Sequence, residues 1–220
     1  TAGIWHFVGG GTDQATNKRG YGPYDRKLFS LNAPADYVTF NSIVDNNGAV
    51  GDERYFVSAS KYTGDASQNY WSDYTTVEDG QEYVVRIYVD NNADPSLGLI
   101  ARDTRGYAIV PTEAGTELQV FGKIYAANAD PDTVWDSTGF FSKDDRKFVL
   151  QYVSGSARYY TINDNGESMA FDLQMDSSIQ QLHLFQSEGI ALGNNSLNGE
   201  ISGGVNRSGY LTFHLIARYQ

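Results

Sequence analysis

A strict alternation of side chains between residues 83 and 89 constrains the fold of this chain more than any other stretch. In an extended strand, YVVRIYV would place Val84, Arg86 and Tyr88 on one face and Tyr83, Val85, Ile87 and Val89 on the other. The turn-forming run EDGQ precedes this stretch, and the run DNNADP ends it. No stretch longer than two helical turns carries an apolar stripe of helical period. The chain is therefore expected to consist of β-strands.

Similar strand-like segments recur along most of the chain. The 16 Tyr and 11 Phe suit pleated, half-buried surfaces, and the 23 Gly suit turns. In one segment, Gly122 is expected to mark a bulge or a bend. The pattern predicts an all-β fold, an antiparallel β-sandwich that is either a jelly roll or two Ig-like halves, with an extended N-terminal arm. The expected strands lie within residues 37–44, 54–60, 83–89, 99–111, 117–128, 147–153, 157–162, 169–175, 179–185 and 210–219.

The first 35 residues differ from the rest, so residues 1–35 are interpreted as an arm with a linker and residues 36–220 as the β-sandwich domain. A sub-boundary is expected near 111–115. The arm opens with an apolar strand followed by three glycines; this candidate assembly strand consists of Ile4, Trp5, His6, Phe7 and Val8. Such a strand either pairs within its own domain or adds to the sheet of a neighbouring copy. Head-to-tail exchange between copies would build a fibre.

Charge and composition exclude several classes of partner. The net charge of -11 disfavours nucleic acid and anionic membrane surfaces, because both are themselves negatively charged. No apolar run approaches the roughly 18 residues of a membrane span. The absence of cysteine removes disulfides and thiolate chemistry. A chain that begins at Thr1 is typical of a processed secreted protein, so a secreted, cell-surface location is expected.

Three acidic loops predict calcium as a candidate cofactor. Hard cations prefer several oxygen ligands on a flexible loop, although none of these loops fits the EF-hand pattern. The alternative is that the acids cap turns and keep the surface soluble. The candidate ligands are Asp45, Asn47, Asp52 and Glu53 in the first loop, Asp90, Asn92 and Asp94 in the second, and Asp130, Asp132 and Asp136 in the third.

Aromatic residues beside amides and acids predict a candidate glycan site. The stretch QNYWSDY places Tyr70, Trp71 and Tyr74 close together, and sugar rings stack on exposed aromatic faces. The alternative is ordinary packing in a tyrosine-rich sandwich.

Catalytic motifs are weak. His6, His183 and His214 are the only histidines, and the last two lie in strand-like segments where histidine is usually structural. No G-x-S-x-G, P-loop or G-x-G-x-x-G occurs. The chain is therefore predicted not to be an enzyme, although paired carboxylates for glycoside hydrolysis stay open among 27 acids.

The stretch VEDGQEYVVRIYVDNNADPSLGLIARDTRGYAIVP resembles the conserved-repeat β-sandwich modules of bacterial secreted and cell-surface proteins. In these modules a glycine turn leads into a tyrosine-containing strand, an Asn-rich loop follows, and the last strand closes with proline. The resemblance covers residues 37–135, and it implies an extracellular β module with no known catalysis.

These observations predict a structural subunit of an extracellular self-assembling fibre or surface layer. Its copies would be joined by strand exchange through the N-terminal arm. The alternative is an extracellular binding or adhesion module for glycans or Ca2+. A glycan-active hydrolase on a β scaffold is the third hypothesis.

Overall fold

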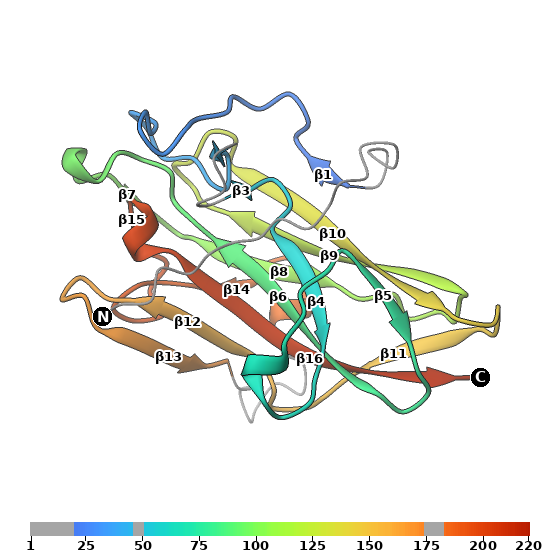
Figure 1. The fold of residues 1–220 in the computed structure, drawn as a ribbon. Helices are drawn as coiled ribbons and strands as arrows, with labels where there is room; N and C mark the ends of the chain where they lie inside the picture. Colours follow the sequence, from blue (N-terminus) through green and yellow to red (C-terminus); the bar gives the residue numbers. More distant parts are fainter. Residues whose placement is uncertain (1–19, 46–50, 174–182) are drawn as a thin grey trace.

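The computed structural model describes residues 20–45, 51–173 and 183–220, and their regular structure is almost entirely β-strand (Figure 1). This confirms the predicted all-β fold. No helix in the described part of the chain has both the length and the apolar character that a membrane crossing requires. The helical segments of this part are single 3-10 turns, namely η2 (Ala66–Gln68), η3 (Pro95–Leu97), η4 (His183–Phe185) and η5 (Val205–Arg207).

One of the two large sheets is built around the long strands β9 and β10. Its neighbouring strands run antiparallel, except that β5 runs parallel to β10. Its path is β1 (Tyr21–Gly22), β10 (Thr133–Ser142), β9 (Glu117–Tyr125), β8 (Arg105–Ile109) and β14 (Ile190–Ala191), with β5 (Tyr74–Val77) beside β10.

The other large sheet is fully antiparallel and is centred on β16, which contacts three strands along its length. Two small two-stranded sheets pair β7 (Ile100–Ala101) with β15 (Ile201–Ser202) and β2 (Val44–Asp45) with β3 (Gly51–Asp52). The path of the large sheet is β13 (Ser168–Asp172), β12 (Arg158–Ile162), β16 (Gly209–Tyr219), β6 (Glu82–Val89) and β4 (Val57–Lys61), with β11 (Phe148–Tyr152) also on β16.

The two large sheets pack as adjoining layers (Figure 1), and Gly122 of β9 lies against side chains of the facing sheet. A Cβ atom on Gly122 would lie 2.7 Å from Val57 Cγ2 and 2.8 Å from Ile87 Cδ1, both on the facing sheet. The ladders of β9 with β8 and with β10 run through Gly122 without interruption. The expected bulge or bend is therefore wrong: glycine is needed here because the facing side chains leave no room for a larger residue.

The described part of the predicted arm packs on the sandwich. β1 pairs with β10, Phe29 forms a bridge with Ile43, and Ala35 forms one with Ala93. Strands on either side of the segment 111–115 also share one sheet, because β8 pairs directly with β9. Their buried residues belong to one continuous hydrophobic core that includes residues from Val38 to Ala217.

Several described segments differ from the sequence prediction. Residues 37–44 are buried mostly as irregular chain, and Phe40 makes only an isolated bridge to Asn91. His183–Phe185 form a 3-10 turn rather than the end of a strand. The sequence prediction also missed the strands β5 and β10 and the two-residue strands β1, β3, β14 and β15. In TVWDSTGFFS, the sequence of β10, small polar residues interrupt the apolar alternation that marks a strand.

Candidate ligand-binding site

The loop between β4 and β5 arches over the outer face of the β6 sheet and is held by local hydrogen bonds. Asp65 caps the 3-10 turn η2, because its Oδ1 accepts from the backbone N–H of Ser67 (3.0 Å) and from the hydroxyl of Ser67 (2.7 Å). Further along, Ser72 exchanges two backbone hydrogen bonds of 3.0 Å with Ala59 of β4. The Tyr70 N–H donates to Ser60 Oγ at 2.9 Å. The loop is thus tied to β4 at Tyr70 and at Ser72.

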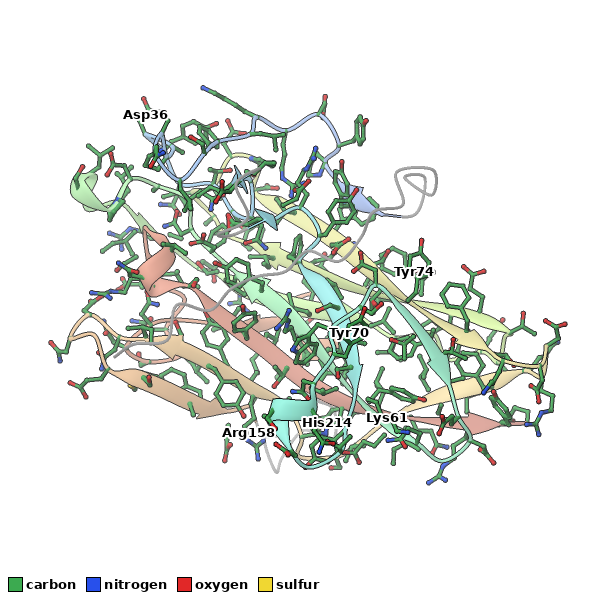
Figure 2. The ribbon with its side chains drawn as sticks, in the orientation of Figure 1. Asp36, Lys61, Tyr70, Tyr74, Arg158 and His214 are labelled. Carbon is green, nitrogen blue, oxygen red and sulfur yellow. The ribbon has the colours of Figure 1, made fainter. Side chains whose placement is uncertain are left out.

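This loop, the end of β4 and strand β5 enclose a shallow pocket of about 360 Å³, here called the tyrosine pocket. Tyr70 is 82 % exposed and Tyr74 is 45 % exposed, so both rings offer apolar surface to a ligand. Figure 2 shows Tyr70, Tyr74 and Lys61 in one region of the molecule. The pocket is lined by Ser60, Lys61, Thr63, Gln68, Tyr70, Ser72, Tyr74, Thr75, Thr76, Glu78 and Tyr83.

One ring stacking and one hydrogen bond to a tyrosine hydroxyl support the β5 side of the tyrosine pocket. The Tyr74 ring stacks on Phe141 of β10, with ring centroids 5.4 Å apart and an interplanar angle of 29°. The hydroxyl of the buried Tyr83 accepts from the Glu78 N–H at 2.9 Å. This wall of the pocket is therefore backed by packed rings.

The rim of the tyrosine pocket carries both hydrogen-bond donors and acceptors. Lys61 Nζ lies 3.5 Å from Glu78 Oε2, and both side chains are more than half exposed. An exposed pair of this kind contributes little to stability, so a ligand can separate it at small cost. The Gln68 amide and several Thr and Ser hydroxyls complete the rim. Such a mixture matches the hydroxyl groups of a neutral sugar.

Trp71, the third predicted glycan residue, does not line the tyrosine pocket. Its ring is stacked on Arg86 of β6, whose guanidinium carbon lies 4.1 Å from the Trp71 ring centroid and 5.0 Å from that of Tyr210. Arg86 Nε also donates to Ser58 Oγ at 3.2 Å, and burial lowers the pKa of Arg86 to about 10. Trp71 thus anchors the loop on the sheet, while Tyr70 and Tyr74 face the pocket.

The structure brings acidic residues from two different predicted calcium loops together inside the protein. Glu53, Asp90 and Asn92 are all buried. The Asn92 amide nitrogen donates to Glu53 Oε1 at 2.9 Å and to Asp90 Oδ2 at 3.2 Å. Burial and then the neighbouring Asp90 raise the pKa of Glu53 well above its usual range, and burial raises that of Asp90 to about 6. Both buried carboxyl groups therefore favour the protonated, uncharged form.

The geometry of this acidic group does not resemble a cation cage. A hydrogen-bond donor, the Asn92 amide, occupies the position between the two carboxyl groups, whereas a cation requires oxygen ligands there. Within residues 20–45, 51–173 and 183–220, no group of three or more acidic or histidine side chains is arranged to hold a metal ion. Calcium binding stays a prediction.

Among the other candidate calcium ligands, Asn47 lies outside the described residues. Asp45 and Asp52 belong to β2 and β3, and Asp52 forms an ion pair of 2.6 Å with Arg54. Asp94 caps η3 by accepting from the Ser96 N–H at 2.9 Å. Asp130 and Asp132 are exposed in the turn before β10.

Asp136 does not share a loop with Asp130 and Asp132, so that part of the prediction is wrong. It lies inside β10, fully buried, where its Oδ2 accepts from the Val57 N–H at 2.7 Å. Burial and then Asp73 raise the pKa of Asp136, and burial raises that of Asp73 to about 7. The sequence carries no signal for this pair, because the parallel pairing of β5 with β10 creates it.

The described histidines make ordinary structural contacts. His214 Nδ1 lies 2.7 Å from Glu82 Oε2, and its ring contacts Tyr62 with centroids 4.6 Å apart. His183 Nδ1 lies 3.5 Å from Glu188 Oε1. His6 and the rest of the candidate assembly strand, Ile4, Trp5, Phe7 and Val8, lie outside the described residues.

Comparison with protein-family models, with curated proteins and with solved structures found no significant match to this chain. The resemblance of residues 37–135 to bacterial surface modules therefore stays a prediction.

Proposed function

We propose that this protein is an extracellular binding module that recognises a neutral glycan in the tyrosine pocket. The observation that carries this proposal is the Tyr70 ring, which is 82 % exposed on a loop whose backbone is hydrogen-bonded to β4. A large aromatic ring in water, held at its backbone, forms a ready stacking surface for the apolar face of a sugar. The second ring, Tyr74, borders the same pocket from β5.

The size and chemistry of the pocket support a sugar ligand. A volume of about 360 Å³ lies at the lower end of the range for small-molecule sites, which fits one or two sugar rings. The rim offers the Lys61 ammonium, the Glu78 carboxylate and the Gln68 amide within one site. A sugar with adjacent hydroxyl groups is able to accept and donate at such a rim.

The proposed extracellular setting rests on the likeness of residues 37–135 to surface modules. The net charge of -11 disfavours polyanionic ligands, so the proposed ligand is a neutral glycan. If the glycan belongs to another cell, binding would lead to adhesion. Calcium is proposed only as an additional ligand of the acidic loops.

The test is a glycan array followed by calorimetry on the purified protein. Wild type is expected to bind a defined glycan, and Tyr70→Ala is expected to weaken the affinity roughly two- to tenfold, because stacking on one ring is worth about 0.5–1.5 kcal/mol. Tyr24→Ala is the matched control, since Tyr24 is 66 % exposed and does not line the tyrosine pocket. Absence of any glycan signal, or equal losses in both variants, would contradict the proposal.

A further inference from the structure

Another pocket of the described structure, larger than the tyrosine pocket, lies where distant segments of the chain meet. Its volume of about 540 Å³ lies within the range of small-molecule sites. Its walls come from the described end of the arm, from the loop between β6 and β7 and from the segment between β15 and β16. The described residues that line it differ from those that line the tyrosine pocket. We call it the apolar pocket, because its walls include Leu31, Pro34, Pro95, Leu99, Ile100 and Val205.

Backbone hydrogen bonds hold the walls of the apolar pocket together. On the side of the arm, the Ala35 N–H donates to the Asn92 carbonyl at 3.1 Å, and the Ala35 carbonyl accepts from the Asp94 N–H at 2.8 Å. In another part of the wall, the Gly203 N–H donates to the Leu99 carbonyl at 3.2 Å. The pocket is thus formed before a ligand arrives, and a preformed site loses less conformational entropy on binding.

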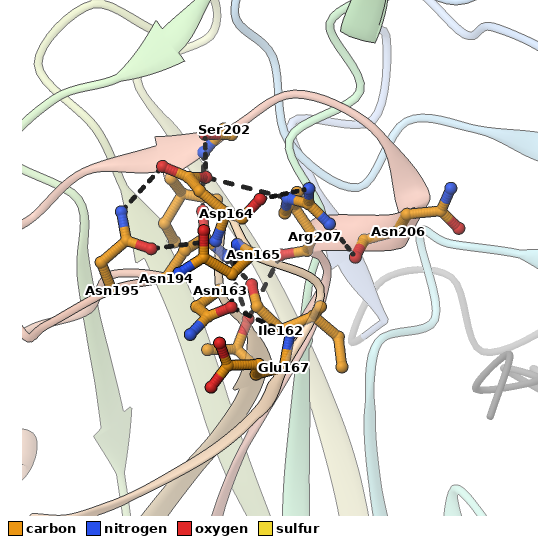
Figure 3. Close-up of polar contacts among 12 residues, drawn as sticks. Ile162, Asn163, Asp164, Asn165, Glu167, Asn194, Asn195, Ser202, Asn206 and Arg207 are labelled. Carbon is orange, nitrogen blue, oxygen red and sulfur yellow. Dashed lines mark hydrogen bonds and ion pairs between the residues drawn. The ribbon is translucent and has the colours of Figure 1, made fainter. Parts of the chain in front are cut away.

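The only charged side chains among the described residues that line the apolar pocket are Asp164 and Arg207 (Figure 3). Asp164 comes from the turn between β12 and β13, and Arg207 is the last residue of η5. Arg207 Nε lies 3.8 Å from Asp164 Oδ1, which is too far for a hydrogen bond. The Arg207 side chain is 26 % exposed and that of Asp164 is 55 % exposed. The pocket therefore combines apolar walls with one positive and one negative group that a ligand can reach.

A hydrogen-bond network holds the Asp164 carboxylate at the pocket (Figure 3). Asn195 donates from Nδ2 to Asp164 Oδ2 at 2.8 Å and accepts at Oδ1 from the Asp164 N–H at 2.9 Å. Ser202 Oγ donates to Asp164 Oδ1 at 3.2 Å. Each oxygen of the carboxylate accepts one of these bonds and has a second lone pair, which is able to accept from an ammonium group.

Arg207 is held by two hydrogen bonds to backbone carbonyl groups and keeps N–H groups for a ligand. One terminal nitrogen donates to the Asp164 carbonyl at 3.2 Å, and the other donates to the Asn206 carbonyl at 3.3 Å. A guanidinium group carries more N–H donors than these two bonds engage, in a planar fork that matches a carboxylate. Arg207 is therefore able to bind a carboxylate without giving up these anchors.

Buried Asn194 fixes the backbone beside this charged pair. Its amide nitrogen donates to Thr161 Oγ1 at 3.1 Å, to the Ile162 carbonyl at 3.2 Å and to the Arg207 carbonyl at 2.8 Å. These bonds tie the segment before β16 to β12. The network therefore holds the turn that carries Asp164 and the segment that carries Arg207 in fixed positions.

We propose that the apolar pocket binds a free α-amino acid with a large apolar side chain. The carboxylate of the ligand binds Arg207, and its ammonium group binds Asp164. Its side chain leaves water and packs on the walls formed by Leu31, Leu99 and Val205. The two charged groups of an α-amino acid are joined through one carbon atom, which suits protein groups as close together as Asp164 and Arg207. This site goes beyond the proposed glycan function, because it uses different residues.

The neighbouring opposite charges of the pocket disfavour ligands that carry only one charge. A ligand with only a carboxylate would place it beside Asp164, and a ligand with only an ammonium group would place it beside Arg207. Each would then face a like charge at short range, which costs affinity. A zwitterion matches both groups and is neutral overall, so the net charge of -11 does not repel it.

Calorimetry on the full-length protein, with leucine as the probe, tests the proposal. Leucine is expected to bind with a saturable signal. Isocaproate is leucine without the ammonium group, and isopentylamine is leucine without the carboxylate. Both are expected to bind roughly tenfold more weakly than leucine, or more weakly still, because each leaves one charge of the pocket unmatched. Alanine keeps both charges and is also expected to bind more weakly, because it leaves the apolar walls uncovered.

Two variants of the charged pair locate the site. Arg207→Gln and Asp164→Asn are each expected to weaken leucine binding roughly tenfold or more, because each removes one charge and keeps a polar side chain. Arg102→Gln is the matched control, since Arg102 forms an exposed ion pair of 3.1 Å with Glu200 and does not line the apolar pocket.

A further variant tests the apolar wall without changing the hydrogen-bond network. Leu31→Ala is expected to weaken leucine binding severalfold, whereas Leu97→Ala is expected to leave it unchanged, since Leu97 is 51 % exposed and does not line the pocket. Tyr70→Ala is expected to leave leucine binding unchanged, which separates this site from the tyrosine pocket. Failure of leucine to bind the wild-type protein would overturn the proposal. So would isocaproate binding as tightly as leucine, or equal effects of Arg207→Gln and Arg102→Gln.

Discussion

The Asn92 amide links the carboxyl groups of Glu53 and Asp90 inside the protein, donating to Glu53 Oε1 at 2.9 Å and to Asp90 Oδ2 at 3.2 Å. Each residue comes from a different acidic loop, and both are buried. Burying two charges side by side is costly, so burial raises the pKa of both carboxyl groups and favours their protonated forms. The neutralised pair makes the folded protein sensitive to pH.

The stability of the protein is expected to decrease as the pH rises from about 4 to about 6. In the unfolded chain these carboxyl groups ionise near pH 4, whereas in the folded protein the pKa of Asp90 is about 6 and that of Glu53 is also raised. The folded state thus binds more protons than the unfolded chain in this pH window. The stabilisation that these protons provide is complete below pH 4 and is lost as the pH rises through the folded-state pKa. Thermal unfolding between pH 4 and pH 8 measures this loss, expected at roughly 1–3 kcal/mol.

Glu53→Gln is the matched variant for this effect. Its amide oxygen is able to accept from the Ile43 N–H and from Asn92 as Glu53 Oε1 does, and its side chain stays uncharged at every pH. The variant is expected to be at least as stable as wild type at pH 8 and to show a flatter pH profile, because the pKa of Glu53 is raised in the folded protein. A steeper profile, or a loss of stability at pH 8, would show that ionisation of Glu53 does not cause the pH dependence.

Asp73→Asn is expected to stabilise the protein at pH 8 by roughly 1 kcal/mol or more. Burial raises the pKa of Asp73 to about 7, and the nearby Asp136 carboxyl makes ionisation of both unfavourable. The uncharged amide of Asn removes the free-energy cost of burying the Asp73 charge above pH 7. At pH 4, where Asp73 is protonated in the folded protein, the substitution is expected to change the stability little. Chemical denaturation at pH 8 and at pH 4 measures the change in stability at each pH. Equal changes at both would show that ionisation of Asp73 does not destabilise the folded protein.

Gly122→Ala is expected to destabilise the protein by roughly 1–3 kcal/mol. The new methyl group would lie 2.7 Å from Val57 Cγ2 and 2.8 Å from Ile87 Cδ1, so the two sheets would have to move apart. Gln151→Ala, at an exposed position of β11, serves as the control and is expected to change stability by less than about 0.5 kcal/mol. Urea denaturation of both variants provides the comparison.

Asn194→Ala is expected to destabilise the β12–β13 hairpin by roughly 1–3 kcal/mol. The substitution leaves the buried carbonyl groups of Ile162 and Arg207 and the N–H of Ser202 without the Asn194 amide. Amide exchange is expected to rise in β12 and β13 more than in β4. A uniform rise across both large sheets would instead indicate that the network stabilises the whole domain.

Local patterns were enough to predict the all-β fold and several strands. The alternation of β6 and the turn residues at both of its ends are properties of a short segment, so they can be read without knowing any partner strand. The closeness of Tyr70 and Tyr74 could be read from their spacing, because loop residues close in sequence tend to share a surface, whereas their exposure was left open between a glycan site and ordinary packing. β10 was missed because its buried face contains Asp136, Thr138 and other polar residues that only a folded environment accommodates.

Only the folded chain decided which distant groups meet. Glu53 reaches Asp90, and Asp73 lies near Asp136, because strand pairing brings separate turns together. Trp71 stacks on Arg86 rather than facing the solvent, because the loop folds back onto β4. Side-chain type and spacing control local conformation, whereas burial and long-range contact depend on the order and register of the strands, which no short stretch of residues encodes.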